Sequence, residues 1–277
     1  MANSALERNP YFNGQAPSQF NAHQAAPGTQ PGYGTPEQLD AQFAKPSASP
    51  DQMDRMSVED TVAKTAGLFV AVLVAAAVAW FVPILMVVGA IGALVLGIVL
   101  AFQREPKPGL IWTFAAAEGL LVGGLTSILE QLYPGIAMQA VLATLAVVAT
   151  VLVLFSFGKV RTSPRMTKIV MVAMVGYLVF SLANFVGMLL TPGSEMFGWR
   201  SSVVIPIFGG IPLGVILGIF AVLMGAYMLV MDFEFIQNGV RSGAPRKYGW
   251  IGAYSLVSTV VFIYVEILRL IAIFRNN

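Results

Sequence analysis

Residues 65–102 read TAGLFVAVLVAAAVAWFVPILMVVGAIGALVLGIVLAF, a long apolar run. As a single helix, at about 1.5 Å per residue, it would be about twice as long as a bilayer is thick. Pro83 lies near its middle, and a proline inside a helix removes a backbone hydrogen bond and clashes with the preceding turn. The run therefore predicts two membrane-spanning helices that are joined by a tight hairpin at Pro83.

The composition identifies lipid as the solvent of this chain. Of its 277 residues, 57% are hydrophobic and only 11% are charged, whereas a soluble domain carries about 25% charged residues. A spanning helix needs about 20 mostly apolar residues, and seven segments meet that length. They are Thr65–Val82, Ile84–Phe102, Gly109–Ile128, Ile136–Phe157, Ile169–Leu190, Val203–Met231 and Trp250–Phe274. The predicted fold is an all-α, polytopic membrane protein with seven transmembrane helices.

The loops between these segments differ in charge. Three alternate loops, near 103–108, 158–168 and 237–249, hold nine Lys and Arg residues, whereas the other loops hold only Arg200. Basic loops stay on the cytoplasmic side of a membrane. With seven spans the N-terminus is then cytoplasmic and the C-terminus is outside. Six spans would force an untargeted N-terminal tail across the membrane, so we prefer seven.

Residues 1–56 differ from the rest of the chain. They are rich in Pro, Gly, Gln and Asn, with few aliphatic side chains, and such a segment cannot bury enough apolar surface to offset its ordering entropy. A basic stretch followed by an apolar run, which marks a signal peptide, is missing from them. We expect a disordered cytoplasmic tail over 1–56 and a membrane domain over 57–277.

Side chains that usually carry catalysis are scarce. The chain has no Cys, and its only His is His23, in the predicted tail. This argues against a Cys nucleophile, a Ser–His pair, a zinc cluster or a haem site in the membrane domain. We therefore expect neither an enzyme nor a resident cofactor, and no nucleic-acid partner.

Carboxylates within apolar helices are the main candidates for function. A carboxylate inside a bilayer costs about 2.5–3.5 kcal/mol on insertion scales, so it usually faces a protein interior or a wet cavity. Asp232 and Glu234 end the sixth predicted span. Two residues apart on a helix, they point to different faces, so one can face the bundle while the other stays at the interface.

Three more acids lie in other spans. Glu266 is surrounded by apolar residues and has Arg269 at i+3, which also allows an ion pair within the helix. Glu118 lies mid-span without a neighbour in sequence that neutralises it, so it is either protonated or in contact with a cation. Glu130 ends the same span, where an interfacial position is the simpler interpretation.

Two of these carboxylates together would form a particular kind of site. Carboxylates that lie close together share a proton, and their hard oxygen atoms suit Ca²⁺. If Asp232 and Glu266 meet in space, they would form a proton-sensitive cation site with Ca²⁺ as ligand or permeant ion.

Four stretches resemble the Bax inhibitor-1 family, the transmembrane Bax inhibitor motif proteins that include the bacterial YccA-type members. The family's third helix is similar to the segment that runs from Pro108-Gly109-Leu110 through Gly119-Leu120-Leu121-Val122-Gly123-Gly124 to Leu129-Glu130. The family's basic turn after the fourth helix resembles Gly158-Lys159-Val160-Arg161. Its acidic motifs in the sixth and the last helix resemble Leu229-Val230-Met231-Asp232-Phe233-Glu234-Phe235-Ile236 and Phe262-Ile263-Tyr264-Val265-Glu266-Ile267-Leu268. Their order and spacing resemble the actinobacterial branch, which has an N-terminal extension. The resemblance covers about residues 60–273.

The resemblance implies a seven-helix bundle whose last helix is surrounded by the other six. It also implies that Asp232 and Glu266 form a pH-sensing pair that gates a Ca²⁺ leak. The second acid here is Glu instead of the family's Asp, and on straight helices the two acids would lie at different depths. The family's basic latch has three candidates in this chain, Arg269, Arg104 and Lys107.

The sequence leads to three functional hypotheses from different classes. The leading hypothesis is a pH-sensitive calcium or cation leak channel in the bacterial plasma membrane, which acts on calcium ions and protons. The alternative is a non-transporting adaptor that modulates a membrane protease or a stress response through a membrane protein partner and the tail. An intramembrane enzyme is the weakest hypothesis, because the sequence shows no set of nucleophile, base and metal ligands.

Overall fold

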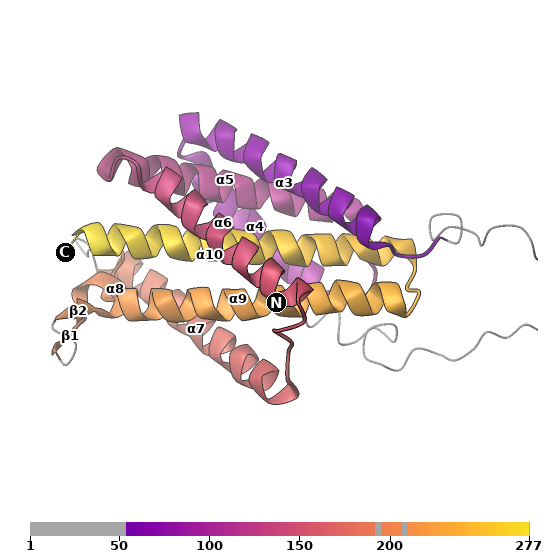
Figure 1. Ribbon diagram of the computed structural model, residues 1–277. Helices are drawn as coiled ribbons and strands as arrows, with labels where there is room; N and C mark the ends of the chain where they lie inside the picture. The colour runs from indigo at the N-terminus through magenta and orange to yellow at the C-terminus, as the bar shows by residue number, and fades with distance from the viewer. Residues whose placement is uncertain (1–53, 192–195, 207–209, 277) are drawn as a thin grey trace, which may run out of the picture.

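The computed structural model describes residues 54–191, 196–206 and 210–276 (Figure 1). Within these ranges, seven helices are long and apolar enough to cross a membrane, as predicted. They are α3 (Val58–Phe81), α4 (Leu85–Phe102), α5 (Pro108–Leu132), α6 (Ile136–Ser156), α7 (Pro164–Leu190), α9 (Leu213–Arg241) and α10 (Gly249–Asn276). The predicted hairpin at Pro83 is confirmed, because α3 ends and α4 begins on either side of it.

The sixth span differs from its predicted bounds. Its helix, α9, begins at Leu213 and ends at Arg241, whereas the apolar pattern predicted Val203–Met231. The preceding residues form the short helix α8 (Trp199–Ser202) and a two-stranded antiparallel hairpin of β1 (Val204–Ile205) and β2 (Ile211–Pro212). Pro212 ends the hairpin and opens α9. The helix therefore continues for more than two turns beyond Asp232, which places this acid within the helix and not at its end.

The last helix is the central one. In its most apolar stretch 56% of the residues are buried, a share that α5 equals and that no other described span reaches. It packs against α9, α3, α6 and α5, and Figure 1 shows it running between α3 and α5 on one side and α9 on the other. The prediction of a seven-helix bundle with the last helix inside is confirmed.

Small residues explain how the helices come so close. A Cβ atom added to Gly123 of α5 would lie 2.1 Å from the Ala76 carbonyl oxygen of α3, and one added to Gly225 of α9 would lie 2.6 Å from Ile263 of α10. Glycine lets helix backbones approach in a membrane, where packing and not the hydrophobic effect drives association. These contacts fix the rotation of α5 and α9, and therefore decide which of their side chains face α10.

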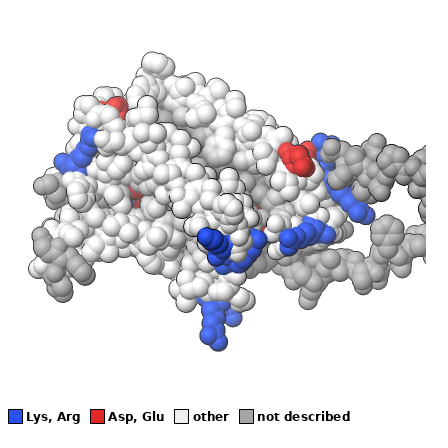
Figure 2. All heavy atoms as spheres, in the orientation of Figure 1, with Lys and Arg blue, Asp and Glu red and all other residues white. Residues whose placement is uncertain are grey.

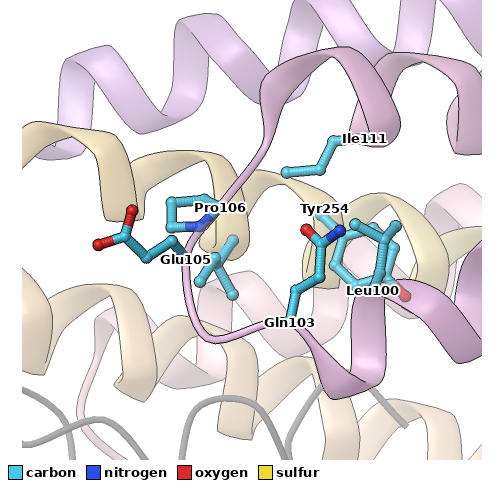
Figure 3. A pocket seen from close by; sticks show the side chains of 7 residues that line it. Leu100, Gln103, Glu105, Pro106, Ile111 and Tyr254 are labelled. Atoms are coloured by element: carbon cyan, nitrogen blue, oxygen red, sulfur yellow. The ribbon is translucent and has the colours of Figure 1, made fainter.

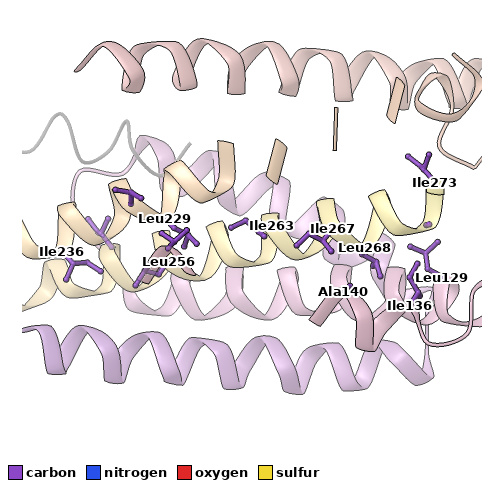
Figure 4. Close-up of a cluster of buried hydrophobic side chains, with 14 of the residues drawn as sticks. Leu129, Ile136, Ala140, Leu229, Ile236, Leu256, Ile263, Ile267, Leu268 and Ile273 are labelled. Atoms are coloured by element: carbon purple, nitrogen blue, oxygen red, sulfur yellow. The ribbon is translucent and has the colours of Figure 1, made fainter. Parts of the chain in front are cut away.

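The core follows α10 along its length. Figure 4 shows aliphatic side chains of α9 and α10 that meet those of α5 and α6 near the far end of the helix. The members labelled there are Leu129, Ile136, Ala140, Leu229, Ile236, Leu256, Ile263, Ile267, Leu268 and Ile273. A helix that is apolar on all sides is buried on all sides, and α10 fits that rule except for a few polar positions.

The surface is what a lipid environment requires. Large aliphatic side chains on α3, α4, α6 and α7 point outward, and uncharged atoms cover most of the face in Figure 2, where Lys and Arg gather in a few groups. The loops 103–107, 157–163 and 242–248, which together with the helix ends beside them carry most of the described Lys and Arg residues, are called the basic-loop end below. Lys247 of the 242–248 loop contacts Glu105 of the 103–107 loop at 3.0 Å, so these two loops lie side by side.

The folded part begins before the predicted boundary at residue 57. The Met56 amide donates to the Ala244 carbonyl at 2.7 Å, Arg55 pairs with Pro245 in an isolated bridge, and the Met56 side chain is 1% exposed. Asp54–Met56, which the sequence assigned to the tail, therefore pack on the loop between α9 and α10. The predicted disorder of the remaining tail, 1–53, lies outside the described residues.

Candidate functional site: carboxylates around the central helix

Polar side chains on α10 divide into two groups along the helix. Near the basic-loop end it carries Ser255, Ser258 and Thr259, and about two turns further along it carries Glu266 and Arg269. Residues four apart share a helix face, so Ser255 and Thr259 point one way, while Ser258 points another. Each group meets carboxylates or guanidinium groups from neighbouring helices.

Asp232 of α9 is held by two hydroxyl groups. Ser255 Oγ donates to its Oδ1 at 2.5 Å, and Thr259 Oγ1 donates to its Oδ2 at 2.7 Å. The side chain is buried, and none of the residues that the structure describes forms an ion pair with it. Two hydrogen bonds to hydroxyls stabilise a carboxylate without neutralising it.

Glu118 of α5 is less well satisfied. Ser258 Oγ donates to its Oε1 at 3.0 Å, whereas its Oε2 is buried without a hydrogen-bond partner in the described structure. The side chain is only 8% exposed. Leaving a buried carboxylate oxygen unpaired is costly, and whether a proton or a cation occupies this position stays a prediction.

Glu266 lies in a different environment, between two arginines. Arg269 Nη1 lies 2.6 Å from its Oε1, and Arg200 Nη1 lies 3.7 Å from its Oε2. Arg200 comes from α8, at the end opposite the basic loops, and its side chain is buried. The ion pair with Arg269 that the spacing predicted is therefore present, and a second guanidinium joins it.

Tyr177 of α7 ties this cluster to the rest of the bundle. Its hydroxyl accepts from Arg200 Nη1 at 2.8 Å and from Arg269 Nη1 at 3.3 Å. Arg200 also donates to Ser181 at 2.7 Å and lies over the Tyr177 ring at 4.9 Å. Such contacts offset part of the cost of burying a guanidinium.

The two acids that the resemblance paired do not share a site. Asp232 contacts Thr259, whereas Glu266 lies seven residues further along α10, about 10 Å at the usual helical rise. Among the residues that the structure describes, no three His, Cys, Asp or Glu side chains are grouped as a metal site would need. Glu118, and not Glu266, lies at the same level of α10 as Asp232. The residues of α10 that bind them, Ser258 and Thr259, are adjacent.

The remaining candidates lie at helix ends and loops. Glu234 accepts from the Thr162 amide at 2.9 Å and from the Thr162 hydroxyl, which fastens the 157–163 loop to α9. Glu130 accepts from the amides of Gly135 at 2.6 Å and Ala137 at 2.9 Å, so it caps the start of α6. Arg104 is exposed in the loop after α4 and, like Lys107, forms no ion pair with a described residue.

Several residues of the site were not predicted. Arg200 was noted only as the single basic residue of the less charged loops, and the hydroxyls of Ser255, Ser258 and Thr259 were not singled out. Their pattern was a usable signal, because Ser and Thr at i and i+4 in a buried helix form one polar stripe. Tyr177 carries no comparable signal in its sequence context.

A comparison with known families agrees with this architecture. The family model described as Bax inhibitor 1 like matches residues 9–276. The chain belongs to the Bax inhibitor 1 like family. No curated protein and no solved structure matches the chain. Family membership and the seven apolar helices together make this chain an integral, multi-pass membrane protein.

Proposed function

We propose that this family member is a pH-sensitive leak channel for Ca²⁺ or other cations, gated by carboxylates of α5 and α9 that face α10. One observation carries the proposal. Asp232 and Glu118 approach α10 from two sides, within one helical turn, and are held only by hydroxyl groups. A buried carboxylate without a basic partner needs a proton or a cation, so its occupancy depends on pH.

The charge distribution along α10 supports a closed state. When all groups are ionised, the half near the basic-loop end carries two negative charges, from Asp232 and Glu118, and the other half carries Glu266 with Arg200 and Arg269. The first half attracts a cation, whereas the second has one positive charge in excess and repels it. Opening therefore requires Arg200 and Arg269 to move, or their ion pairs with Glu266 to break. Glu266, Arg200 and Arg269 are called the arginine cluster below.

The orientation follows from the loop charges. By the positive-inside rule the basic-loop end lies in the cytoplasm, and the resemblance to the actinobacterial branch of the family supports placing the protein in a bacterial plasma membrane. The carboxylate pair at Asp232 and Glu118 faces the cytoplasmic half of the bilayer, and the arginine cluster faces the outer half. The proposed role is transport and not catalysis.

The test is Ca²⁺ flux into liposomes that contain the purified protein, at about pH 6 and about pH 8, a range in which buried carboxylates change protonation. We expect a flux that depends on pH and changes in the Asp232→Asn and Glu118→Gln variants. Glu130→Gln is the matched control, since the hydrogen bonds of this acid cap the start of α6 and involve none of the hydroxyl groups that hold Asp232 and Glu118.

Two results would contradict the proposal. Flux no greater than that of protein-free liposomes in every condition would favour the non-transporting adaptor. Flux that is lost on deletion of residues 1–53, while both acid variants stay active, would give the tail the role that we assign to the carboxylates.

A further inference from the structure

A small pocket opens at the basic-loop end, between the loop after α4 and the first turns of α10 (Figure 3). Its lining consists of Leu100, Gln103, Glu105, Pro106, Ile111, Ile251 and Tyr254. The room inside is about 20 Å³, which is enough for a water molecule. The pocket thus brings solvent to the seam between α5 and α10.

The contact between α5 and α10, called the seam here, extends from the pocket to Glu118. On α5, Ile111 in the pocket wall and Glu118 are seven residues apart, and on α10 the same spacing separates Ile251 from Ser258. Seven residues are two helical turns, so each pair lies on one face of its helix. Ser258 donates to Glu118, so the two faces that form the pocket also meet at the carboxylate.

Two buried oxygen atoms mark the ends of this seam. Gln103 Oε1, in the pocket wall, and Glu118 Oε2, at the inner end, are buried without hydrogen-bond partners in the described structure. Buried acceptors of this kind are normally satisfied by protein, water or an ion. Their positions suit a path for a proton carried by water or for a cation without its hydration shell.

Two aromatic rings stand between the pocket and the carboxylate. Tyr254 lines the pocket and packs edge-on against Phe114 of α5, with ring centroids 4.9 Å apart. Phe114 precedes Glu118 by four residues and Tyr254 precedes Ser258 by four, so both rings lie one turn nearer the pocket than the Ser258–Glu118 bond. Both rings are buried.

We infer that Glu118 is a cation-binding position reached from the basic-loop end through this pocket, and that Tyr254 and Phe114 close the path to it. The occupant is a small cation, either a proton delivered by water or a metal ion such as Ca²⁺. The inference rests on the proposed function for the identity of the ion, whereas the path itself can be tested without any flux.

The chain has no cysteine, so a single introduced thiol reports where water-soluble reagents reach. The Ser258→Cys variant in liposomes is treated from each side with a membrane-impermeant, cationic methanethiosulfonate. Lys159→Cys, in a basic loop, and Gln131→Cys, at the end of α5, show which side is exposed to reagent.

We expect the Ser258→Cys thiol to react from the basic-loop end, and on the order of tenfold faster when Tyr254→Ala is added, which corresponds to a barrier lower by about 1.4 kcal/mol. The neighbouring Thr259→Cys variant is the matched control, because this position faces Asp232 and should not respond to Tyr254→Ala. Phe114→Ala should act like Tyr254→Ala, which provides a second variant if one does not fold.

Charge selectivity tests the ion site. The cationic reagent should react faster at Ser258→Cys than an anionic methanethiosulfonate of similar size, and Glu118→Gln should remove that preference. Slowing of the cationic reagent by added Ca²⁺ would assign the site to metal ions. Acidification slows both reagents because it removes the reactive thiolate, so a fall in the ratio of the cationic to the anionic rate at low pH, without an effect of Ca²⁺, would assign the site to protons.

Three results would overturn the inference. The first is reaction at Ser258→Cys only from the opposite end. The second is equal acceleration at Ser258→Cys and Thr259→Cys, which would mean general loosening. The third is a charge preference that survives Glu118→Gln. A protein without Ca²⁺ flux but with the expected thiol reactivity would refute the proposed function and leave the path in place.

Discussion

Buried carboxylates have different partners along the two halves of α10. Near the basic-loop end, Asp232 and Glu118 are held by three hydroxyl groups, and no basic side chain of the described residues forms an ion pair with either. Near the other end, Glu266 lies between Arg200 and Arg269. Breaking a buried ion pair is costly because it leaves an uncompensated charge, whereas a carboxylate held by hydroxyls can gain or lose a proton at little structural cost. The difference separates a part that holds the bundle together from a part that can respond to pH.

The largest effect should come from Glu266→Gln. This change leaves the buried Arg200 and the half-buried Arg269 without a counter-charge, so the free energy of unfolding should fall by about 3–5 kcal/mol. Denaturant unfolding in detergent, followed by circular dichroism, measures the loss. Glu130→Gln, which removes only an exposed cap on α6, should cost about 1 kcal/mol. Equal losses in the two variants would show that the arginine cluster does not stabilise the bundle.

A smaller effect is expected where hydroxyls hold Asp232. Ser255→Ala and Thr259→Ala each remove one donor to the carboxylate, and each should cost about 1.5–3 kcal/mol, the usual worth of a hydrogen bond to a charged group. Thr150→Ala is the control, because its hydroxyl bonds only its own helix backbone.

The same two variants carry a pH prediction. The donors stabilise the charged form of Asp232, so removing them favours the protonated form. The pH at which liposome Ca²⁺ flux is half-maximal should therefore move upward, whether protons open or close the path. A midpoint that stays fixed or moves downward would show that Asp232 is not the group that senses pH.

The smallest effect on stability should come from Asp232→Asn. Asparagine has the same shape and can still bond both hydroxyls, while the unpaired buried charge is gone, so the free energy of unfolding should change by no more than about 1 kcal/mol. The flux assay should nevertheless lose much of its pH dependence. If this variant lost as much stability as Glu266→Gln, Asp232 would have a cationic partner and the two halves of α10 would not differ.

The spans were predictable because their signal is local. An apolar run of sufficient length spans a membrane whatever surrounds it, and a proline between two such runs ends a helix, as Pro83 does. The sixth span was the exception. Within the predicted span, Val204–Ile205 and Ile211–Pro212 form the β1–β2 hairpin, and the helix begins only after Pro212. Hydropathy does not distinguish an apolar hairpin from an apolar helix.

The candidate acids were also predictable, because a carboxylate in an apolar helix is rare and costly. Asp232, Glu118 and Glu266 are all buried, and Glu266 has the partner at i+3 that its sequence suggested. A pairing between Asp232 and Glu266 was implied by family resemblance, and the structure separates them along α10. Resemblance transfers residue types more safely than it transfers contacts.

The sequence by itself determined the lipid solvent, the seven spans, the charged loops and the small set of buried acids, since each depends on composition within a short window. The tertiary structure decided which partners those acids have. Glycine contacts set the rotation of α5 and α9, which turns Glu118 toward Ser258 and Asp232 toward Ser255. Arg200 reaches Glu266 from a loop far away in sequence. Partners across helices depend on rotation and packing between distant segments, and no local pattern of residues encodes them.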